Sequence, residues 1–261
     1  MRKRRGLKGK KAFITGGSSG IGLATGELLA RNGAEVFIAS RDQKKLAEAE
    51  NRIRNCSGSG VMDVTDRSSV IQLTGRYLEN NGPPDILVNS AGMACASRLE
   101  EMPDEVIYST LETNLLGTIL TTRCFLDDMK KGSSIVNIGS IAGFLGLYGY
   151  TVYSASKFGI TGFSESLRME LRPRGINVSI VMPPDTDTPQ LEKENRTKPE
   201  TLKKISGSIK PIAPEKVAGS VLKAIETGRF MVIPTFSGKL TYAVNRIFPG
   251  LTRRYLDRKI G

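Results

Sequence analysis

The stretch of sequence that decides the fold is Thr15-Gly16-Gly17-Ser18-Ser19-Gly20-Ile21-Gly22. It follows the apolar run 12–14 and precedes a helix expected over about 20–32. Glycines at such a junction permit a tight turn and close approach to a pyrophosphate, which the N–H groups at the start of a helix attract. This position favours a dinucleotide site over an ordinary glycine-rich turn. The residues expected to contact the cofactor here are Gly16, Ser18, Ser19, Gly20, Ile21 and Gly22.

Apolar runs alternate with helix-period segments along most of the chain. Strands are expected over 12–14, 35–39, 61–62, 85–89, 134–138 and 176–181. Continuous apolar runs are typical of strands buried on both faces, and repeated strand–helix units imply a parallel sheet. We predict an α/β fold, a single-domain Rossmann-like doubly wound parallel sheet flanked by helices. A basic segment 1–10 precedes the catalytic domain 11–235, which has a substrate loop over about 183–214, and a basic amphipathic tail covers 236–261.

The composition excludes several classes of enzyme. The 261 residues include no histidine, which excludes Ser-His-Asp hydrolases and histidine-ligated zinc, and no metal site is expected. The three cysteines are widely spaced, as in a reduced cytoplasmic protein. No run approaches the roughly 20 apolar residues of a membrane-spanning helix. We therefore expect a cytoplasmic protein, or one bound peripherally to the cytosolic face of a membrane.

The net charge of +12 is concentrated at the two ends of the chain. Basic residues crowd positions 2–11 and recur over 246–259. Such ends fit a solvated surface, nucleic acid or an anionic membrane. Since no motif interleaves aromatic and basic residues, no specific nucleic-acid partner is expected.

The end of the second expected strand predicts which dinucleotide binds. A carboxylate there would bond the ribose of NAD, but this chain has Ser40 and Arg41. A guanidinium grips a 2′-phosphate through charge-assisted hydrogen bonds, which favours NADPH. Asp42 is interpreted as the N-cap of the next helix. Further cofactor contacts are expected after the next two strands, from Asp63 and Val64 at the adenine and from Asn89, Ala91 and Gly92 along the nicotinamide ribose.

The chemistry of the site is predicted by Tyr153 and Lys157, which share one face of a helix because they lie four residues apart. A nearby ammonium is expected to lower the pKa of the phenol, which is near 10 in a free tyrosine. Tyr153 then donates a proton to a carbonyl oxygen as hydride reaches the carbon. Ser140 is expected to bond the same oxygen, and Lys157 to hold the nicotinamide ribose. Asn114 is expected to hold a water that relays protons to Lys157.

Together these residues resemble the short-chain dehydrogenase/reductase family over about residues 8–235. The family pattern of Thr-Gly-x-x-x-Gly-x-Gly, Asn-x-Ala-Gly, Asn, Ser and Tyr-x-x-x-Lys falls on 15–22, 89–92, Asn114, Ser140 and 153–157. The resemblance implies a carbonyl reductase or alcohol dehydrogenase that forms homodimers or homotetramers. It also implies cofactor contacts from Pro183, Thr186 and Thr188.

The proline-rich and charged segment after the sixth expected strand indicates the substrate. Pro183-Pro184-Asp185-Thr186-Asp187-Thr188-Pro189, with the motifs at 194–201 and 205–208, resembles the 3-ketodihydrosphingosine reductase subfamily. That resemblance implies reduction of a long-chain lipid ketone in sphingolipid synthesis, with Asp185 and Asp187 as candidates for attracting the substrate's ammonium. One alternative is a short-chain dehydrogenase/reductase that acts on another lipid ketone or alcohol, such as a steroid, a retinoid or a 3-ketoacyl compound. An alternative of another class is a non-catalytic NADPH-binding sensor or scaffold.

The tail carries Leu240, Ala243, Val244, Ile247 and Phe248 on one face of an expected helix, with basic residues beside it. Pro249-Gly250 is expected to end this helix, and a second basic and apolar stretch follows. An amphipathic basic helix of this kind fits an anionic membrane surface. It equally fits a cover over the protein's own core or a subunit interface.

Overall fold

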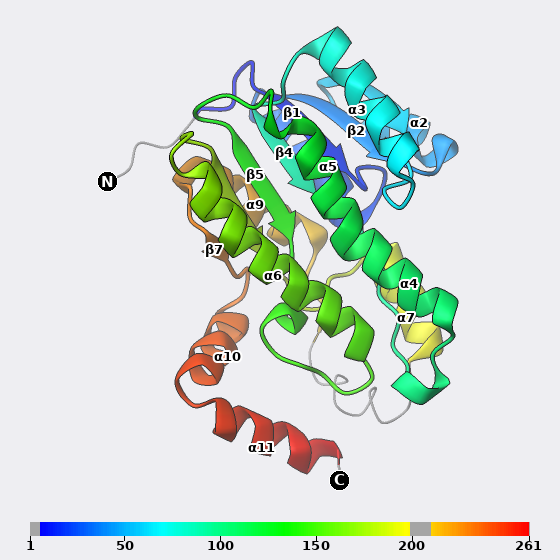
Figure 1. The fold of residues 1–261 in the computed structure, drawn as a ribbon, viewed down its shortest axis with the longest axis vertical. Coiled ribbons are helices and arrows are strands. Elements are labelled where there is room, and N and C mark those ends of the chain that lie inside the picture. Colours follow the sequence, from blue (N-terminus) through cyan, green and yellow to red (C-terminus); the bar gives the residue numbers. More distant parts are fainter. Residues whose placement is uncertain (1–5, 199–209, 261) are drawn as a thin grey trace.

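The computed structural model describes residues 6–198 and 210–260. In that part of the chain, seven parallel strands form one sheet in the order β3-β2-β1-β4-β5-β6-β7, with helices on both faces (Figure 1). The predicted α/β fold is confirmed. The order reverses between β1 and β4, where open parallel sheets form a crevice for ligands. The strands are β1 (Lys11–Thr15), β2 (Glu35–Ser40), β3 (Cys56–Val61), β4 (Ile86–Asn89), β5 (Ser134–Ile138), β6 (Asn177–Val181) and β7 (Met231–Val232).

The sheet has one apolar core on each face. Neighbouring residues of β1 point to opposite sides, so Ile14 belongs to one core and Phe13 to the other. The first core is closed by α1 (Gly20–Arg31), α2 (Gln43–Arg52) and α9 (Pro214–Thr227), and the second by α3 (Arg67–Asn81), α5 (Gly117–Leu126) and α6 (Thr151–Leu171). This double burial explains the continuous apolar runs of the strands.

Further elements lie at the carboxyl edge of the sheet and beyond it. They are η1 (Leu99–Glu101), α4 (Asp104–Leu111), the π-helical turn η2 (Glu112–Leu116), η3 (Ile141–Gly143), α7 (Pro189–Thr197), α10 (Phe236–Ile247) and α11 (Pro249–Ile260). The helices α10 and α11 extend away from the sheet (Figure 1). Among the described residues, no helix combines the length and the apolar character needed to cross a bilayer.

The structure differs from the expected elements in four places. The third strand is Cys56–Val61 rather than 61–62, because its two glycines and two serines conceal a strand that pairs with β2 alone. The helix through Asn114 is divided by η2 and ends at Leu126. A short seventh strand follows α9. Part of the expected substrate loop forms α7, while its stretch 199–209, including the motif at 205–208, lies outside the described residues. Residues 1–5 of the basic segment 1–10 lie outside them as well.

Candidate active site

A cavity of about 1240 Å³ opens at the carboxyl edge of the sheet. It begins at the glycine turn after β1, passes the ends of β4, β5 and β6, and continues to α10 and α11. The structure therefore brings together segments from almost the whole chain. The predicted site residues that line this cavity are Gly16, Ser19, Gly20, Ile21, Gly22, Ala91, Gly92, Ser140, Tyr153, Lys157, Pro183, Thr186 and Thr188.

The glycine turn has no room for side chains. A Cβ on Gly22 would lie 2.2 Å from the carbonyl oxygen of Gly16, and one on Gly16 would lie 2.8 Å from the backbone of Ala91. Gly16 also has φ +66°, which favours glycine. The hydroxyl of Thr15 accepts hydrogen bonds from the amides of Ser90 and Ala91, both at 3.1 Å. The turn thus presents bare backbone at the start of α1, a shape and a dipole that fit a pyrophosphate.

A second group of predicted residues gathers at the end of β2 and beyond β3. The Ser18 hydroxyl donates to that of Ser40 at 2.8 Å. Arg41 lies beside them, 65% exposed, with Nη1 3.8 Å from a carboxylate oxygen of Asp63. The carboxylate of Asp42 accepts from the amide of Lys45, which confirms it as the N-cap of α2. The exposed guanidinium of Arg41 is thus available to bind an anion. Val64, by contrast, is buried beside Gly117.

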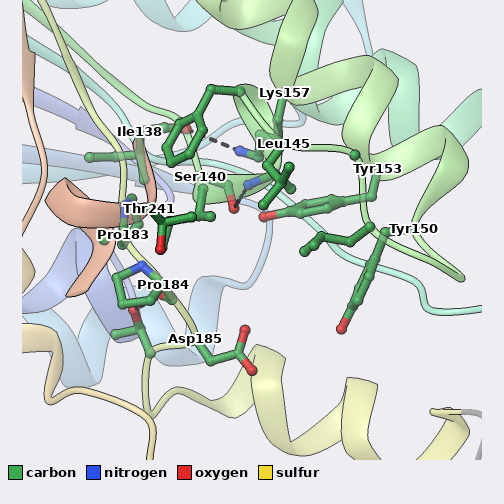
Figure 2. A pocket seen from close by; sticks show the side chains of 18 of the residues that line it. Ile138, Ser140, Leu145, Tyr150, Tyr153, Lys157, Pro183, Pro184, Asp185 and Thr241 are labelled. Atoms are coloured by element: carbon green, nitrogen blue, oxygen red, sulfur yellow. Dashed lines mark hydrogen bonds between the residues drawn. The ribbon is translucent and has the colours of Figure 1, made fainter. Parts of the chain in front are cut away.

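The catalytic candidates converge beside this cofactor cleft (Figure 2). Tyr153 and Lys157 lie in the first two turns of α6, and Ser140 lies two residues after the end of β5. The Lys157 ammonium donates to the carbonyl oxygen of Ile138 at 3.0 Å and lies 5.6 Å from the ring centre of Tyr153. The Ser140 hydroxyl hydrogen-bonds the Tyr153 phenol. A carbonyl oxygen placed between these two hydroxyls would meet two hydrogen-bond donors at once.

The expected lowering of the phenol pKa is wrong for this structure. Burial raises the pKa of Tyr153 to about 12, and the hydrogen bond from Ser140 offsets only part of that change. The carboxylates of Glu194 and Asp185 contribute to the same increase in the pKa of Tyr153. Burial also lowers the pKa of Lys157 to about 8, which weakens the positive charge expected to favour the phenolate. Tyr153 is therefore protonated at neutral pH, as a proton donor must be.

Asn114 lies in the π-helical turn, a feature frequent at functional sites. Its side-chain oxygen accepts from the amide of Met93 at 2.8 Å. Its nitrogen donates to the carbonyl of Met93 at 2.9 Å and to the hydroxyl of Ser156 at 3.0 Å. The side chain thus joins the loop after β4 to α6. A Cβ on Gly92 would lie 3.3 Å from the Asn114 oxygen and 3.8 Å from the Lys157 nitrogen, so these three residues lie close together.

Asn89 faces the protein interior rather than the cofactor cleft. Its amide nitrogen donates to the hydroxyl of Thr122 and to the side-chain oxygen of Asn137, both at 2.9 Å. Asn137 in turn donates to Ser164 on α6. The Asn89 side chain is thus engaged inside the protein, and the expected contact of the segment 89–92 with the nicotinamide ribose stays a prediction that its backbone would have to fulfil. A residue at the end of a strand points to one face or the other, and here the buried polar network holds the asparagine inward.

Two walls of the cavity lie outside the predicted site residues. Tyr150 and Glu194, with Gln190 and Leu191 on α7, form one of them. The helical pattern after Pro189 would indicate this wall in the sequence. The prolines and charges of the segment conceal that pattern. Residues of the tail form the other, with apolar side chains such as Leu240 and Leu256 beside polar ones such as Asn245 and Arg253. The tail thus covers the protein's own cavity, while Ile247 and Phe248 stay 66% and 60% exposed.

Comparison with known proteins agrees with this geometry. The family model of the short chain dehydrogenases matches residues 10–199. A 3-dehydrosphinganine reductase of Danio rerio is 37% identical over 234 residues, covering 86% of this chain and 70% of the relative. A 3-dehydrosphinganine reductase of Arabidopsis thaliana is 37% identical over 243 residues, covering 90% and 72%.

A solved structure has the same fold. A short-chain dehydrogenase/reductase of Burkholderia phymatum in complex with NAD superimposes with a TM-score of 0.84 at 24% identity, covering 95% of this chain and 96% of the other. The match of the family model, the identity with two reductases and the arrangement of Ser140, Tyr153 and Lys157 lead to one conclusion. The chain belongs to the short-chain dehydrogenase/reductase family of oxidoreductases.

Proposed function

We propose that this enzyme reduces the ketone of 3-ketodihydrosphingosine to the alcohol with NADPH. The observation that carries the proposal is that the Ser140–Tyr153 pair opens into a cavity of about 1240 Å³, whose wall includes apolar side chains of the tail such as Leu240, Val244 and Leu256. The reductases of this substrate that resemble the chain over most of its length support it. Another lipid ketone would use the same donors, and a panel of substrates separates the two.

Each of the site residues is proposed to have a distinct role in the reduction. NADPH, when bound, supplies the hydride. Tyr153 donates a proton to the carbonyl oxygen, and Ser140 polarises the carbonyl through its hydroxyl. Lys157 holds the ribose beside Tyr153, and Asn114 fixes the loop after β4 and returns protons toward Lys157 through a water. The glycine turn, with Ser18, Ser19 and Ile21, holds the pyrophosphate, and Pro183, Thr186 and Thr188 close over the nicotinamide end.

The direct test is oxidation of NADPH by the purified protein given 3-ketodihydrosphingosine in mild detergent. If the protein turns over this substrate and the variant Tyr153→Phe does not, the result supports both the proposed reaction and Tyr153 as the proton donor. Binding of NADPH without turnover of this or any other lipid ketone contradicts the proposal in favour of a sensor or scaffold.

Arg41 is proposed to select NADPH over NADH, with Ser18 and Ser40 beside it. Asp63 and Val64 are proposed to contact the adenine. The exposed guanidinium of Arg41 can bond the 2′-phosphate, and a hydrogen bond to a charged group contributes about 1.5–3 kcal/mol. We expect Arg41→Ala to raise the KM for NADPH about 30-fold and to leave the KM for NADH within about twofold. Arg52→Ala, which removes an exposed arginine at the far end of α2, is the control. An unchanged ratio of the two KM values would mean that the phosphate is bound elsewhere.

We also propose that α10 and α11 bind the cytosolic face of an anionic membrane, from which the lipid enters. These helices and Phe248 between them carry apolar side chains among basic residues, and each of Leu240, Ile247, Phe248, Leu251 and Tyr255 is more than half exposed. Apolar side chains that enter the interface and cations that meet anionic headgroups both stabilise such binding. The residues 236–261 are accordingly proposed as a tail distinct in role from the catalytic domain 11–235.

Vesicle binding tests the membrane surface. Each basic residue near an anionic bilayer contributes about 1 kcal/mol, so the double variant Arg254→Gln, Arg258→Gln should bind phosphatidylserine vesicles about 30-fold more weakly. The matched control is Arg67→Gln, Arg76→Gln on α3, which should bind as the unaltered protein does. Equal binding by all three proteins in a sedimentation assay would refute the membrane role of the tail.

We propose that copies of this chain associate into homodimers or homotetramers through their long helices. Tyr108 on α4, Leu116 in η2 and Met169 on α6 are 64%, 49% and 62% exposed and support an apolar contact between copies.

A further inference from the structure

The first helix of the tail, α10, packs on the segment 141–144, which follows the serine of the catalytic pair. The side-chain amide of Asn245 donates a hydrogen bond to the carbonyl oxygen of Phe144 at 2.8 Å. The rings of Phe144 and Tyr242 meet edge to face, with their centres 5.1 Å apart. A Cβ on the buried Gly238 would lie 3.4 Å from the side chain of the first residue of that segment. One face of α10 is thus held against the body of the protein.

Thr241 lies on this same face of α10. It follows Gly238 by three positions and precedes Asn245 by four, the spacings at which residues of a helix are neighbours. Because both of those residues contact the segment after β5, Thr241 lies toward it as well, and it lines the cavity together with Ser140 (Figure 2). The tail therefore adds a hydroxyl to the cavity in which the ketone is reduced.

The hydroxyl of Thr241 is available to a ligand. Hydroxyls inside helices often bond the carbonyl four residues earlier, as that of Thr118 does at 2.9 Å and that of Ser164 at 2.7 Å. Among residues 6–198 and 210–260, the Thr241 hydroxyl has neither this bond nor another hydrogen-bond partner. A hydroxyl left unpaired costs free energy once a ligand excludes water from it. A substrate with a hydrogen-bonding group at this point should therefore be favoured over one with methylene groups alone.

We propose that Thr241 binds a hydroxyl on the head group of the substrate and thereby selects hydroxylated ketones. This inference rests on the proposed function. In 3-ketodihydrosphingosine the ketone carbon bears the alkyl chain on one side and an amino-bearing carbon on the other, with a primary hydroxyl one carbon further. The alkyl chain offers no hydrogen bond, and one neutral hydroxyl would compensate a buried ammonium poorly. The primary hydroxyl fits Thr241 best, since each of the two groups can donate to the other or accept from it.

The test is Thr241→Val, which keeps the shape of the side chain and removes its hydroxyl. The measured quantity is kcat/KM for 3-ketodihydrosphingosine and for its 1-deoxy analogue, which has hydrogen in place of the primary hydroxyl. A hydrogen bond between neutral groups is worth up to about tenfold, so we expect a loss of about five- to tenfold for the hydroxylated ketone. The 1-deoxy ketone should lose no more than about twofold.

Two further variants serve as controls for this substitution. Thr241→Ser keeps the hydroxyl and should hold kcat/KM for the hydroxylated ketone within about twofold of the original value. Thr151→Val makes the same replacement at the exposed start of α6 and should leave both ketones unaffected.

Asn245 is a positioning residue in this proposal, because its bond to Phe144 holds α10, and Thr241 with it, in place. Asn245→Leu keeps the size of the side chain and removes the donor. It should lower the preference for the hydroxylated ketone over the 1-deoxy ketone, and adding Thr241→Val should lower it no further, because both changes remove one interaction. Equal losses on the two ketones in Asn245→Leu would overturn this role of Asn245.

The two substrates keep the outcomes distinct. Equal losses on both ketones in Thr241→Val, or no loss on either, would overturn the proposal and leave the proposed function intact. A loss on the hydroxylated ketone that also appears in Thr241→Ser would overturn it as well, because the hydroxyl would not be its cause. Unaltered enzyme that reduces neither ketone would refute the proposed function, and this inference with it.

Discussion

Tyr153→Phe is expected to reduce kcat about 10³-fold or more while NADPH binds within about twofold of its original affinity. General acid catalysis by a positioned side chain contributes about 10²–10⁴-fold, and this hydroxyl is the proton donor proposed at the carbonyl. A loss of 10³ corresponds to about 4 kcal/mol of transition-state stabilisation. Removal of the hydroxyl leaves the ring, which packs near Tyr150, and the ammonium of Lys157 unchanged. Single-turnover kinetics and a fluorescence titration with NADPH measure the two quantities.

The control for this variant is Tyr150→Phe, which removes the neighbouring phenol from the same wall of the cavity. That phenol bonds Glu194 rather than Ser140, so kcat on a neutral ketone should fall far less than in Tyr153→Phe. If Tyr153→Phe retained more than a tenth of the original kcat, another group would have to supply the proton.

Gly22→Ala should abolish tight NADPH binding and destabilise the protein by about 2–3 kcal/mol, in the upper range for overpacking. The new methyl group would lie 2.2 Å from the carbonyl oxygen of Gly16 and 2.8 Å from its carbonyl carbon. Both are backbone atoms of the turn that holds the pyrophosphate, so relief requires α1 to move away from β1. Urea unfolding and NADPH titration report the two effects separately.

Gly75→Ala is the matched control for that substitution. Gly75 also lies inside a helix, α3, but nothing stands within 4 Å of the place its Cβ would take. Alanine is favoured over glycine in a helix interior by about 0.5–1 kcal/mol, so this variant should be slightly more stable and bind NADPH normally. Equal stability of the two variants would show that the turn adapts to a side chain, contrary to the close packing described above.

The parts of the site that depend on local sequence were predicted. A glycine turn between a strand and a helix, the N-cap at Asp42 and the shared face of Tyr153 and Lys157 each depend on residues near one another in the chain. The carboxyl edge of a parallel sheet then collects the ends of several strands, which placed Ser140 with them.

The parts that depend on distant contacts were not predictable. The inward direction of Asn89 depends on Thr122 and Asn137, from two other elements. The raised pKa of Tyr153 depends on burial and on carboxylates from the segment after β6, which no spacing around Tyr153 reveals. The tail showed an apolar face in the sequence, but only the path of the chain after β7 shows that the face lines a cavity.

The position of α10 and α11 in chain order has a consequence for how such an enzyme can diversify. The groups proposed to move the proton and hold the cofactor all precede residue 190, whereas the tail's share of the cavity wall follows residue 236. That share of the wall is thus encoded in a separate stretch of the gene from the reacting groups. We expect exchange of the last two helices to alter which substrates are accepted while the groups proposed to carry the reaction stay in place.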